Sequence, residues 1–564
     1  MSTTLKLKSI ALAIACSTAV TCTAQETLSL RYDTAREQVV AKQNGHSLDL
    51  PRQESQVESS CLYRDGIGNA YVFLVGEEGN GSQWLVGDKA GLLKTPLHVR
   101  FIALPPTGTL CAVDGDKLFV NEEGVGLWEY AADADAETSR RPVILEKPFG
   151  ALASIGAFTV WNGRVIVQDS ESEDVHVFER DGKRWKEIAL HAIPALNGQD
   201  VDELSVVAAT NSQLTLRAII DEGNREFTMP WTAAKAPVPN NVKTIYVTPT
   251  AQTEPVNRAG DAADDPAIWV NSRKPGESRI LGTDKQGGLQ VFDLWGTRLQ
   301  DLRVGRLNNV DVRSNFRHGE ETIAIAVASN RDNESLHLFR IDPNDGEVSV
   351  IGEAPTKHKD IYGLCMGRLK DGRVFVIANQ KDGTFVQYQL QSNGNAVDAR
   401  KIREFRVASQ PEGCVVNDRT GDLFIGEESK GVYQFPLDPA KPATLSNVIA
   451  VGDVLKKDVE GMGIYNGSKR DYLVVSSQGN DSYVILDATA PFRVRGIVRV
   501  MADGRSAIDG ASETDGLEVS SANLGGAYGK GILIVQDGRK RMPEAPQNYK
   551  YVPWESIAEG LQLD

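Results

Sequence analysis

Acidic side chains are concentrated in one short segment, residues 260–269, which read Gly-Asp-Ala-Ala-Asp-Asp-Pro-Ala-Ile-Trp. Its three aspartates, Asp261, Asp264 and Asp265, fall within five residues and would repel one another strongly unless a cation lay between them. Taken alone, the segment is also explained by a solvated acidic turn at the start of a strand. The cation hypothesis therefore depends on whether other ligands converge on the same place.

Acidic and amide residues recur further along the chain, close to the starts of short apolar runs. They are Asn308, Asn309, Asp311, Glu412, Glu427, Glu428, Asp458, Glu460, Asp509 and Asp515. If these runs are strands that line one channel, the side chains converge on a small volume. Convergent carboxylates need a hard cation, and an all-oxygen ligand set of variable geometry favours Ca²⁺. Zinc is disfavoured, because no histidine or cysteine cluster has ligand spacing.

Three basic residues stand where a short apolar run meets its turn: Lys285, Arg331 and Lys381. Each by itself is also explained as a surface residue. Together they fall in successive sequence units beside the predicted calcium ligands, and metal held by carboxylates next to Lys and Arg binds and activates phosphate esters. Other motifs are incomplete or missing, since 525–531 is not a full P-loop and no Gly-x-Ser-x-Gly elbow occurs.

The overall charge limits the expected partners. The 564 residues include 61 Lys and Arg against 76 Asp and Glu, a formal net charge of −15. An acidic surface repels phosphate backbones and anionic lipid, so we expect neither nucleic acid nor a membrane surface as a partner. Solubility alone would also explain the charge.

Short runs of β-branched and aromatic residues recur after residue 25, and sustained helical periodicity is nearly absent. Examples are 70–75, 117–120, 164–167, 322–327, 373–377, 422–425 and 471–475, most of them beside Asp-Gly, Asn-Gly or Gly-Asp turns. Many short strands at this spacing predict an all-β fold, which could be a sandwich, a barrel or a propeller.

An internal repeat favours the propeller. The stretches that begin at Thr109 and Glu412 share a skeleton of Cys, apolar residues, a turn, Leu-Phe, Glu-Glu and a Gly before an aromatic strand. Three units of roughly 40–55 residues recur in the same order in both halves, a length typical of four-stranded blades. We therefore expect two propeller-like domains, 25–238 and 241–564, joined by a proline-bearing linker at 233–241.

The first residues, 1–24, are expected to be a signal peptide, because two lysines precede a short apolar run and a small-residue stretch. The mature protein is then periplasmic or secreted, with lipoprotein anchoring as the weaker alternative. Export permits disulfides. The repeat places Cys61 near Cys111 and Cys365 near Cys414 on adjacent blades, but the sequence leaves disulfides and buried free thiols equally open.

The motifs along 245–560 resemble those of the β-propeller phytases, which are alkaline, calcium-dependent 3-phytases. The matching stretches are DAADDPAIW (261–269), GRLNNVDVR (305–313), ASNR (328–331), YG (362–363), EG (412–413), EE (427–428), DVEG (458–461), SSQGN (476–480) and DGASETDG (509–516). The resemblance implies a six-bladed C-terminal propeller. It also implies that the N-terminal domain is a related, incomplete propeller-like domain without catalytic activity.

The same resemblance implies an activity, a cofactor and a set of site residues. The activity is release of phosphate from phytate (myo-inositol hexakisphosphate), free or as its calcium salt, through attack of a calcium-bound water. Several Ca²⁺ ions and a monomeric enzyme are expected. The residues implied to act on the substrate are Lys285, Arg331, Tyr362, Lys381, Glu412 and Glu428. Those implied to bind calcium are Asp261, Asp264, Asp265, Asp311, Glu412, Glu428, Asp458, Glu460, Asp509 and Asp515.

Two residues depart from the family pattern. Gln252 stands where an acid usually precedes Thr-Glu-Pro, and Gln286 stands where a second lysine is common. Both departures are expected to weaken the binding of calcium or substrate. Two other functions stay open at this stage: a different calcium-propeller hydrolase such as a lactonase, which would need a His–Asp pair in the channel, and a non-enzymatic binding propeller.

Overall fold

The structure, a computed structural model, describes residues 28–221, 223–232 and 241–564. The predicted signal peptide, 1–24, lies outside the described residues, and so does the predicted linker except for its last residue, Asn241.

The chain divides into two compact units, Met1–Val238 and Pro239–Asp564. Strands dominate both units, and the described residues include one α-helix, α1 (Trp554–Leu561). Short 3-10 helices occur at Glu77–Gly79, Pro194–Leu196, Pro275–Glu277, Gln478–Asn480 and Gly526–Tyr528. The all-β prediction is confirmed. Among the described residues, no helix has the length and apolar character needed to cross a lipid bilayer.

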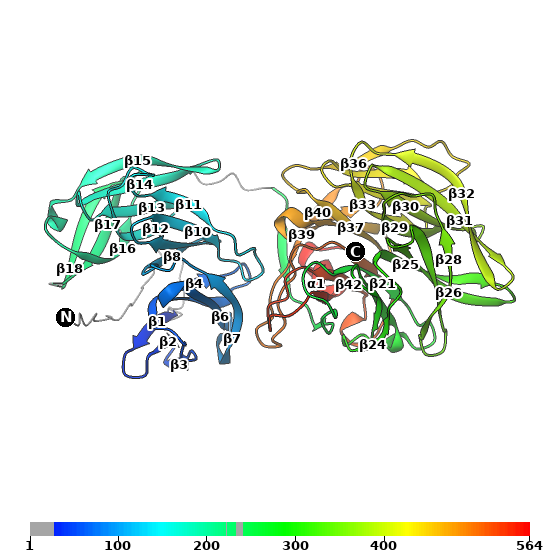
Figure 1. Cartoon of the computed structure of the whole chain (residues 1–564), viewed down its shortest axis with the longest axis horizontal. Coiled ribbons are helices and arrows are strands. Elements are labelled where there is room, and N and C mark those ends of the chain that lie inside the picture. Colours follow the sequence, from blue (N-terminus) through cyan, green and yellow to red (C-terminus); the bar gives the residue numbers. More distant parts are fainter. Residues whose placement is uncertain (1–27, 222, 233–240) are drawn as a thin grey trace. The chain divides into compact units, whose positions relative to one another are not determined.

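The second unit contains six sheets, in which consecutive strands pair antiparallel; they are coloured from green to red in Figure 1. The first four are β21–β24 (Ala263–Trp269, Arg279–Asp284, Gly288–Phe292, Arg298–Leu302), β25–β28 (Leu307–His318, Glu321–Asn330, Ser335–Ile341, Val348–Pro355), β29–β32 (Ile361–Arg368, Val374–Gln380, Thr384–Asn393, Ala396–Arg406) and β33–β36 (Pro411–Asn417, Asp422–Glu427, Gly431–Pro436, Ser446–Ala450). The last two are β37–β40 (Val459–Asn466, Asp471–Ser477, Ser482–Asp487, Val494–Val500) and β41–β43 (Leu517–Ser520, Ile532–Asp537, Asn548–Pro553).

The six sheets form a closed ring. The first strand of each sheet contacts the first strand of the next, in the order β21, β25, β29, β33, β37 and β41, and β41 contacts β21 again. Two strands from the start of the unit complete the last two sheets: β19 (Thr244–Val247) runs parallel to β40, and β20 (Ala251–Gln252) runs antiparallel to β43. The prediction of a six-bladed propeller is confirmed.

Apolar side chains fill the space between neighbouring sheets of the second unit. Phe375 and Phe385 of one sheet pack with Leu423 and Ile425 of the next, and all four side chains are fully buried. Because each strand has two faces, a sheet packed on both sides needs apolar residues at nearly every position, as in the run Val374–Ala378. Polar side chains that could form a site are therefore expected at the ends of the strands.

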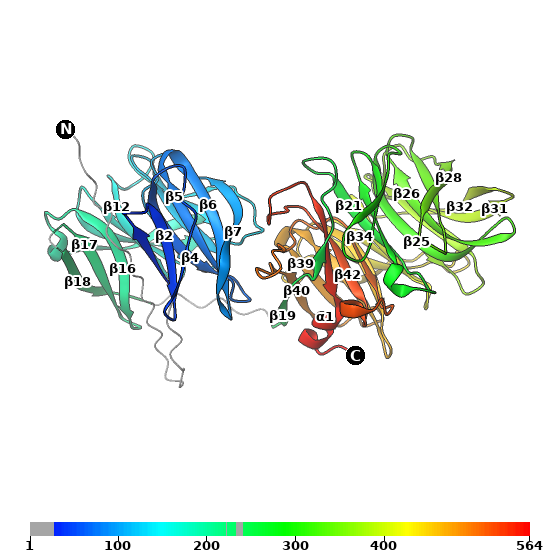
Figure 2. The same ribbon diagram turned by 90° about the horizontal axis from the view of Figure 1, so that it is seen from below.

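The first unit contains five sheets, coloured from blue to teal in Figure 2. They are β1–β3 (Ser29–Asp33, Gln38–Gln43, His46–Asp49), β4–β7 (Val57–Arg64, Ala70–Gly76, Asn80–Asp88, Gly91–Ala103), β8–β11 (Cys111–Asp114, Lys117–Glu122, Gly126–Ala131, Arg141–Leu145), β12–β15 (Ile155–Trp161, Arg164–Asp169, Asp174–Asp181, Arg184–Ala192) and β16–β18 (Val201–Ala209, Gln213–Ile220, Gly223–Pro230). Their first strands contact one another in sequence, from β1 to β16. Within the described part of this unit β16 and β1 make no comparable contact, so the described sheets form an open row.

Disulfides join neighbouring sheets at matching places in both units. Cys61 in β4 is bonded to Cys111 in β8, and Cys365 in β29 is bonded to Cys414 in β33. The structure thus decides for disulfides at both pairs, which the sequence left open.

Replacement of both Cys365 and Cys414 by alanine is expected to lower the free energy of unfolding by about 3–4 kcal/mol, because a cross-link between residues 49 apart restricts the unfolded chain. Chemical denaturation followed by circular dichroism measures this loss. An unfolding free energy within about 0.5 kcal/mol of the wild type would contradict the stabilising role.

Candidate active site

Five inner strands begin in the same way, with a polar side chain at their second residue. These residues are Asp264, Asn308, Tyr362, Glu412 and Glu460 in β21, β25, β29, β33 and β37. In each of these strands the pairing with the next strand is irregular between the first and the fourth residue. A bulge of this kind bends a strand and redirects its side chains. The repeated bulge therefore places the five polar groups at the same end of the ring.

A second set of positions repeats in the same way, at the first residue after the second strand of each sheet. These residues are Lys285, Arg331, Lys381, Glu428, Gln478 and Gly538, in chain order. The first three sheets thus carry a cation at this place, and the fourth carries a carboxylate. The site has a basic side and an acidic side.

Glycines let the inner strands approach closely beneath these side chains. A Cβ atom on Gly413, next to Glu412, would lie 2.2 Å from the carbonyl oxygen of Glu460. A Cβ atom on Gly516 would lie 2.4 Å from the Cα atom of Asp265, where the last sheet meets the first. Any larger residue would force the strands apart, so the acid-glycine pairs narrow the ring around the acidic groups.

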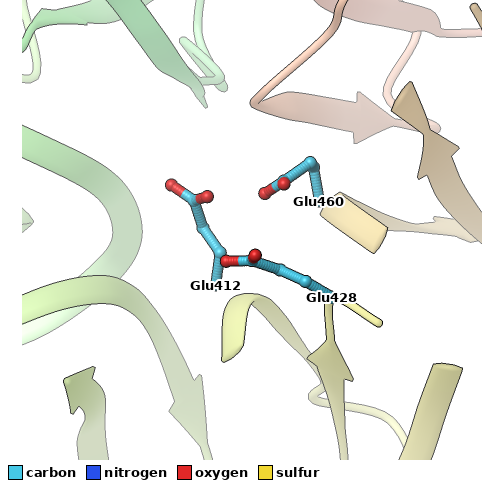
Figure 3. Close-up of side chains that lie close together, drawn as sticks. All are labelled: Glu412, Glu428 and Glu460. Atoms are coloured by element: carbon cyan, nitrogen blue, oxygen red, sulfur yellow. The ribbon is translucent and has the colours of Figure 1, made fainter. Parts of the chain in front are cut away.

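Three glutamates come together at the centre of the site. Glu412, Glu428 and Glu460 each offer a carboxylate oxygen within 4.8 Å of the others. Figure 3 shows the three side chains turned toward one another, Glu412 and Glu460 from β33 and β37 and Glu428 from the turn after β34. Glu412 is fixed from two sides, because Tyr362 donates a hydrogen bond to its Oε2 at 2.7 Å and Asn308 Nδ2 donates to its Oε1 at 3.0 Å.

Several oxygens of this cluster lack a hydrogen-bond donor although they are buried. Both carboxylate oxygens of Asp264 and the Oε2 atom of Glu460 accept no hydrogen bond. Burial raises the pKa of Glu460 well above its usual range, and the charges of Glu412, Asp515 and Glu428 raise it further. Burial likewise raises the pKa of Glu428 to about 7, with added repulsion from Glu412.

These carboxylates fit a divalent cation. Buried carboxylate oxygens without donors are costly, and a hard cation among them would satisfy the oxygens and remove the repulsion. The donors are all oxygens at flexible side chains, which suits calcium. The residues that would hold the ion are Glu412, Glu428 and Glu460, with Asp264 close by.

Lys285 lies beside the cluster and contacts three aspartates. Its Nζ atom is 2.7 Å from Asp261 Oδ1, 2.7 Å from Asp515 Oδ2 and 3.5 Å from Asp264 Oδ2. The last distance is that of an ion pair without a hydrogen bond. Burial opposes the charge on Lys285, but Asp264 and Asp515 outweigh it and raise the pKa of the ammonium. Lys285 is therefore a fixed positive charge on the wall of the site.

The two other predicted cations meet at Tyr362. The Arg331 guanidinium carbon lies 5.8 Å from the centre of the Tyr362 ring, and Lys381 Nζ lies 4.7 Å from it. Arg331 also donates a hydrogen bond of 3.1 Å to Asn308 Oδ1. Cation–π contacts and this hydrogen bond hold both positive groups next to the phenol.

A cavity of about 610 Å³ opens beside Lys285, Tyr362 and two of the three clustered glutamates. Its walls include Lys285, Tyr362, Glu412, Glu460, Gln478 and Asp515, together with the loop that follows β42. No serine, cysteine or histidine is among the described residues that line it. The cavity thus combines positive and negative groups, and its described lining offers no serine hydroxyl, cysteine thiol or histidine imidazole as a nucleophile.

Some residues predicted to bind calcium have other partners. Asp265 Oδ2 accepts a hydrogen bond of 3.2 Å from the backbone of Val310. Asp311 accepts hydrogen bonds of 2.7 Å from Arg313 Nη1 and 2.7 Å from the Met366 amide. These two aspartates tie neighbouring inner strands together and do not belong to the glutamate cluster.

Two more predicted ligands, Asp509 and Asp458, differ in where they lie. Asp509 forms an ion pair of 2.8 Å with Lys550. Asp458 is half-buried and adds to the repulsion that raises the pKa of Glu428, after burial as the main cause. The structure brings Asp458 near the cluster and leaves Asp509 with a lysine.

The sequence assigned no role to two residues that complete the site. Asn308 links Arg331 to Glu412, and Gln478 donates a hydrogen bond of 2.6 Å to Asp515 Oδ1. Both lie in motifs already noted, and their equivalent positions in the repeat are the signal that identifies them.

Gln286, which departs from the family pattern, donates hydrogen bonds to the backbone oxygens of Ala259 and Asp261, at 3.2 and 2.9 Å, and so anchors the acidic loop.

Comparisons with known proteins identify the family of the chain. A family model described as Phytase matches residues 224–564. The chain belongs to the phytase family. The 3-phytase of Bacillus subtilis (strain 168) is 37% identical over 345 residues, which cover 58% of this chain and 89% of that protein. The family resemblance and the enzyme class predicted from the motifs are both confirmed.

A solved structure was also found, that of a functionally unknown protein from Desulfotomaculum acetoxidans DSM 771. It shares 12% sequence identity and a TM-score of 0.31, over 61% of this chain and 95% of that chain. A TM-score this low supports no conclusion about fold or function.

Proposed function

We propose that the second unit hydrolyses the phosphate monoesters of phytate, free or as its calcium salt, with bound calcium. The observation that carries the proposal is the pairing of the glutamate cluster with three cations: Lys285 lines the cavity, and Arg331 and Lys381 lie against Tyr362, which lines it too. Metal-binding carboxylates beside Lys and Arg are suited to phosphate esters. Membership of the phytase family supports phytate as the substrate.

The chain's own cations would bind the substrate. Lys285 lines the cavity, and Arg331 and Lys381 stand beside Tyr362, so an anionic phosphate meets positive groups from three consecutive sheets. Bound calcium would supply positive charge to the phosphate oxygens and lower the pKa of a water molecule. Tyr362 and Asn308 keep the Glu412 carboxylate in one orientation through their hydrogen bonds.

The reaction we propose is direct hydrolysis. A water oxygen forms a bond to phosphorus while the bond between phosphorus and the inositol oxygen breaks. The attacking water gives up one proton and the inositol oxygen gains one, so the products are the alcohol and inorganic phosphate. The lack of a serine, cysteine or histidine among the described lining residues favours this route over a covalent phosphoenzyme. It also disfavours the lactonase alternative, which needs a histidine in the channel.

The first unit is proposed to be non-catalytic. The second residues of its described inner strands β4, β8, β12 and β16 are Glu58, Ala112, Gly156 and Asp202, in place of the polar series of the second unit. This series has carboxylates on two strands and small apolar residues on the other two. It does not reproduce the ring of five polar side chains in the second unit.

Phosphate release from phytate at roughly pH 7–8 tests the proposal. Release is expected with calcium present and is expected to fall by about 10²-fold or more when a chelator removes calcium, with recovery after calcium is restored. Colorimetric measurement of inorganic phosphate gives the rate. No release with calcium present would leave a non-enzymatic binding propeller as the better account.

A further inference from the structure

A lysine ammonium is buried where the ring of the second unit closes. Lys550 belongs to β43, and its side chain has no exposed surface. In the antiparallel ladder it stands opposite Gln252 in β20, the strand that the start of the unit adds to the last sheet. Lys550 therefore occupies the joint between the first and the last part of the unit.

Four side-chain oxygens surround this ammonium. Its Nζ atom donates hydrogen bonds to Asp509 Oδ1 at 2.8 Å, Asn548 Oδ1 at 2.8 Å and Gln252 Oε1 at 3.0 Å. Asp537 Oδ2 forms an ion pair with it at 2.9 Å. These partners come from β20, β42, β43 and the segment before β41, so one cation links all of them.

The charges at this joint balance. A second buried lysine, Lys540, lies 3.8 Å from Asp509 Oδ1 and donates hydrogen bonds to the carbonyl oxygens of Met542 and Pro543. Two buried aspartates therefore face two buried ammonium groups. The remaining oxygen of Asp509 accepts a hydrogen bond from the backbone amide of Arg541.

A calcium ion does not fit this arrangement. Calcium takes six to eight oxygens at about 2.3–2.6 Å, and the space between the available oxygens is filled by the Lys550 ammonium. Entry of the ion would have to displace that ammonium and leave it buried without a partner, which costs several kcal/mol. The site around the glutamate cluster differs, because Glu460 Oε2 accepts no hydrogen bond and neither oxygen of Asp264 does. At the joint, Asp537 Oδ2 also accepts no hydrogen bond, but the Lys550 ammonium lies 2.9 Å from it.

We infer that Lys550 is a built-in cation that holds the ring closed in place of a metal ion, and that Asp509 is not a calcium ligand. Closure of the ring at this joint then needs no calcium, even if the glutamate cluster binds it. The prediction from the sequence that Asp509 binds calcium is replaced by a structural role, and Gln252 acts as a neutral partner of the ammonium.

Thermal unfolding of the full chain with calcium or with a chelator tests this inference. Lys550→Met is expected to lower the melting temperature by roughly 5–10 °C, equally in both conditions, because it leaves two buried aspartates short of a cation. Lys530→Met is the matched control: this exposed lysine pairs with Glu555 at 2.7 Å, and its loss is expected to shift the melting temperature by less than about 2 °C.

A gain of calcium dependence provides a second, opposite readout. Lys550→Glu would place three carboxylates and two amide oxygens at the joint, a ligand set that suits calcium. This variant is expected to melt early in the chelator, to regain stability when calcium is added, and to bind one calcium more than the wild type in equilibrium dialysis.

Calcium counting keeps the inference testable even if the Lys550 variants do not fold. Asp537→Asn, which retains a side chain of the same shape, is expected to bind as many calcium ions per chain as the wild type. Loss of one ion in Asp537→Asn, or recovery of Lys550→Met by calcium, would overturn the inference.

Discussion

The Lys285→Met variant is expected to hydrolyse phytate with a kcat/KM about 10²–10³-fold below that of the wild type. The Lys285 ammonium lines the cavity and lies 2.7 Å from both Asp261 and Asp515. Methionine keeps most of the aliphatic volume and removes the charge that would meet the phosphate. The measurement is steady-state phosphate release from phytate with calcium present.

Calcium binding separates this effect from a general loss of the site. Because Lys285 repels a divalent cation, its removal is expected to raise the affinity for calcium, measured by isothermal titration calorimetry, while activity falls. Lys274→Met is the matched control. This exposed lysine lies in the connection between β21 and β22, pairs only with Glu277 in the described residues and is not among the residues that line the cavity. A Lys285→Met variant within tenfold of wild-type kcat/KM would contradict the phosphate-binding role.

Much of this site could be predicted from the sequence because the fold is repetitive. Acid-glycine pairs such as Glu412-Gly413 recur at strand starts, and a cation follows the second strand in three consecutive units, as Lys285 does. Once the chain is known to be a propeller, equal positions in the repeat must lie at equal heights in the ring. The cluster of Glu412, Glu428 and Glu460 follows from that rule.

The partners of individual carboxylates could not be predicted in this way. Asp311 and Asp509 carry the same side chain as Asp264, but a nearby Arg313 and a Lys550 far along the chain neutralise them. Asp264 has Lys285 at 3.5 Å and accepts no hydrogen bond. Whether an aspartate is neutralised depends on which basic side chain the fold brings near it. The sequence around the aspartate does not give that information.

The cysteines show the same limit. Near-equal spacings placed each pair on adjacent blades, but a disulfide needs the two Cα atoms within about 7 Å. The structure gives 5.6 Å for Cys365 and Cys414. That distance depends on the register between inner strands, which the bulges at their starts determine.

The Glu412→Gln variant is expected to bind calcium on the order of 10–100-fold more weakly than the wild type, because loss of a group that merely orients a ligand already costs that much. Glu412 is buried at the centre of the cluster, and Tyr362 and Asn308 each donate a hydrogen bond to it. Glutamine keeps the shape but removes the charge, and its amide nitrogen cannot accept the hydrogen bond that the replaced oxygen accepted.

Activity is expected to fall with calcium affinity in this variant, and excess calcium is expected to restore only part of it, because the orientation set by Tyr362 is also disturbed. Glu427→Gln is the control: Glu427, which precedes Glu428 in the sequence, accepts hydrogen bonds from Ser409 and Tyr433 and does not belong to the cluster. Calorimetric titration with calcium and phosphate-release rates over a range of calcium concentrations measure both effects. If Glu412→Gln and Glu427→Gln bound calcium equally well, the glutamate cluster would not be the calcium site, and the cations alone would have to account for phosphate binding.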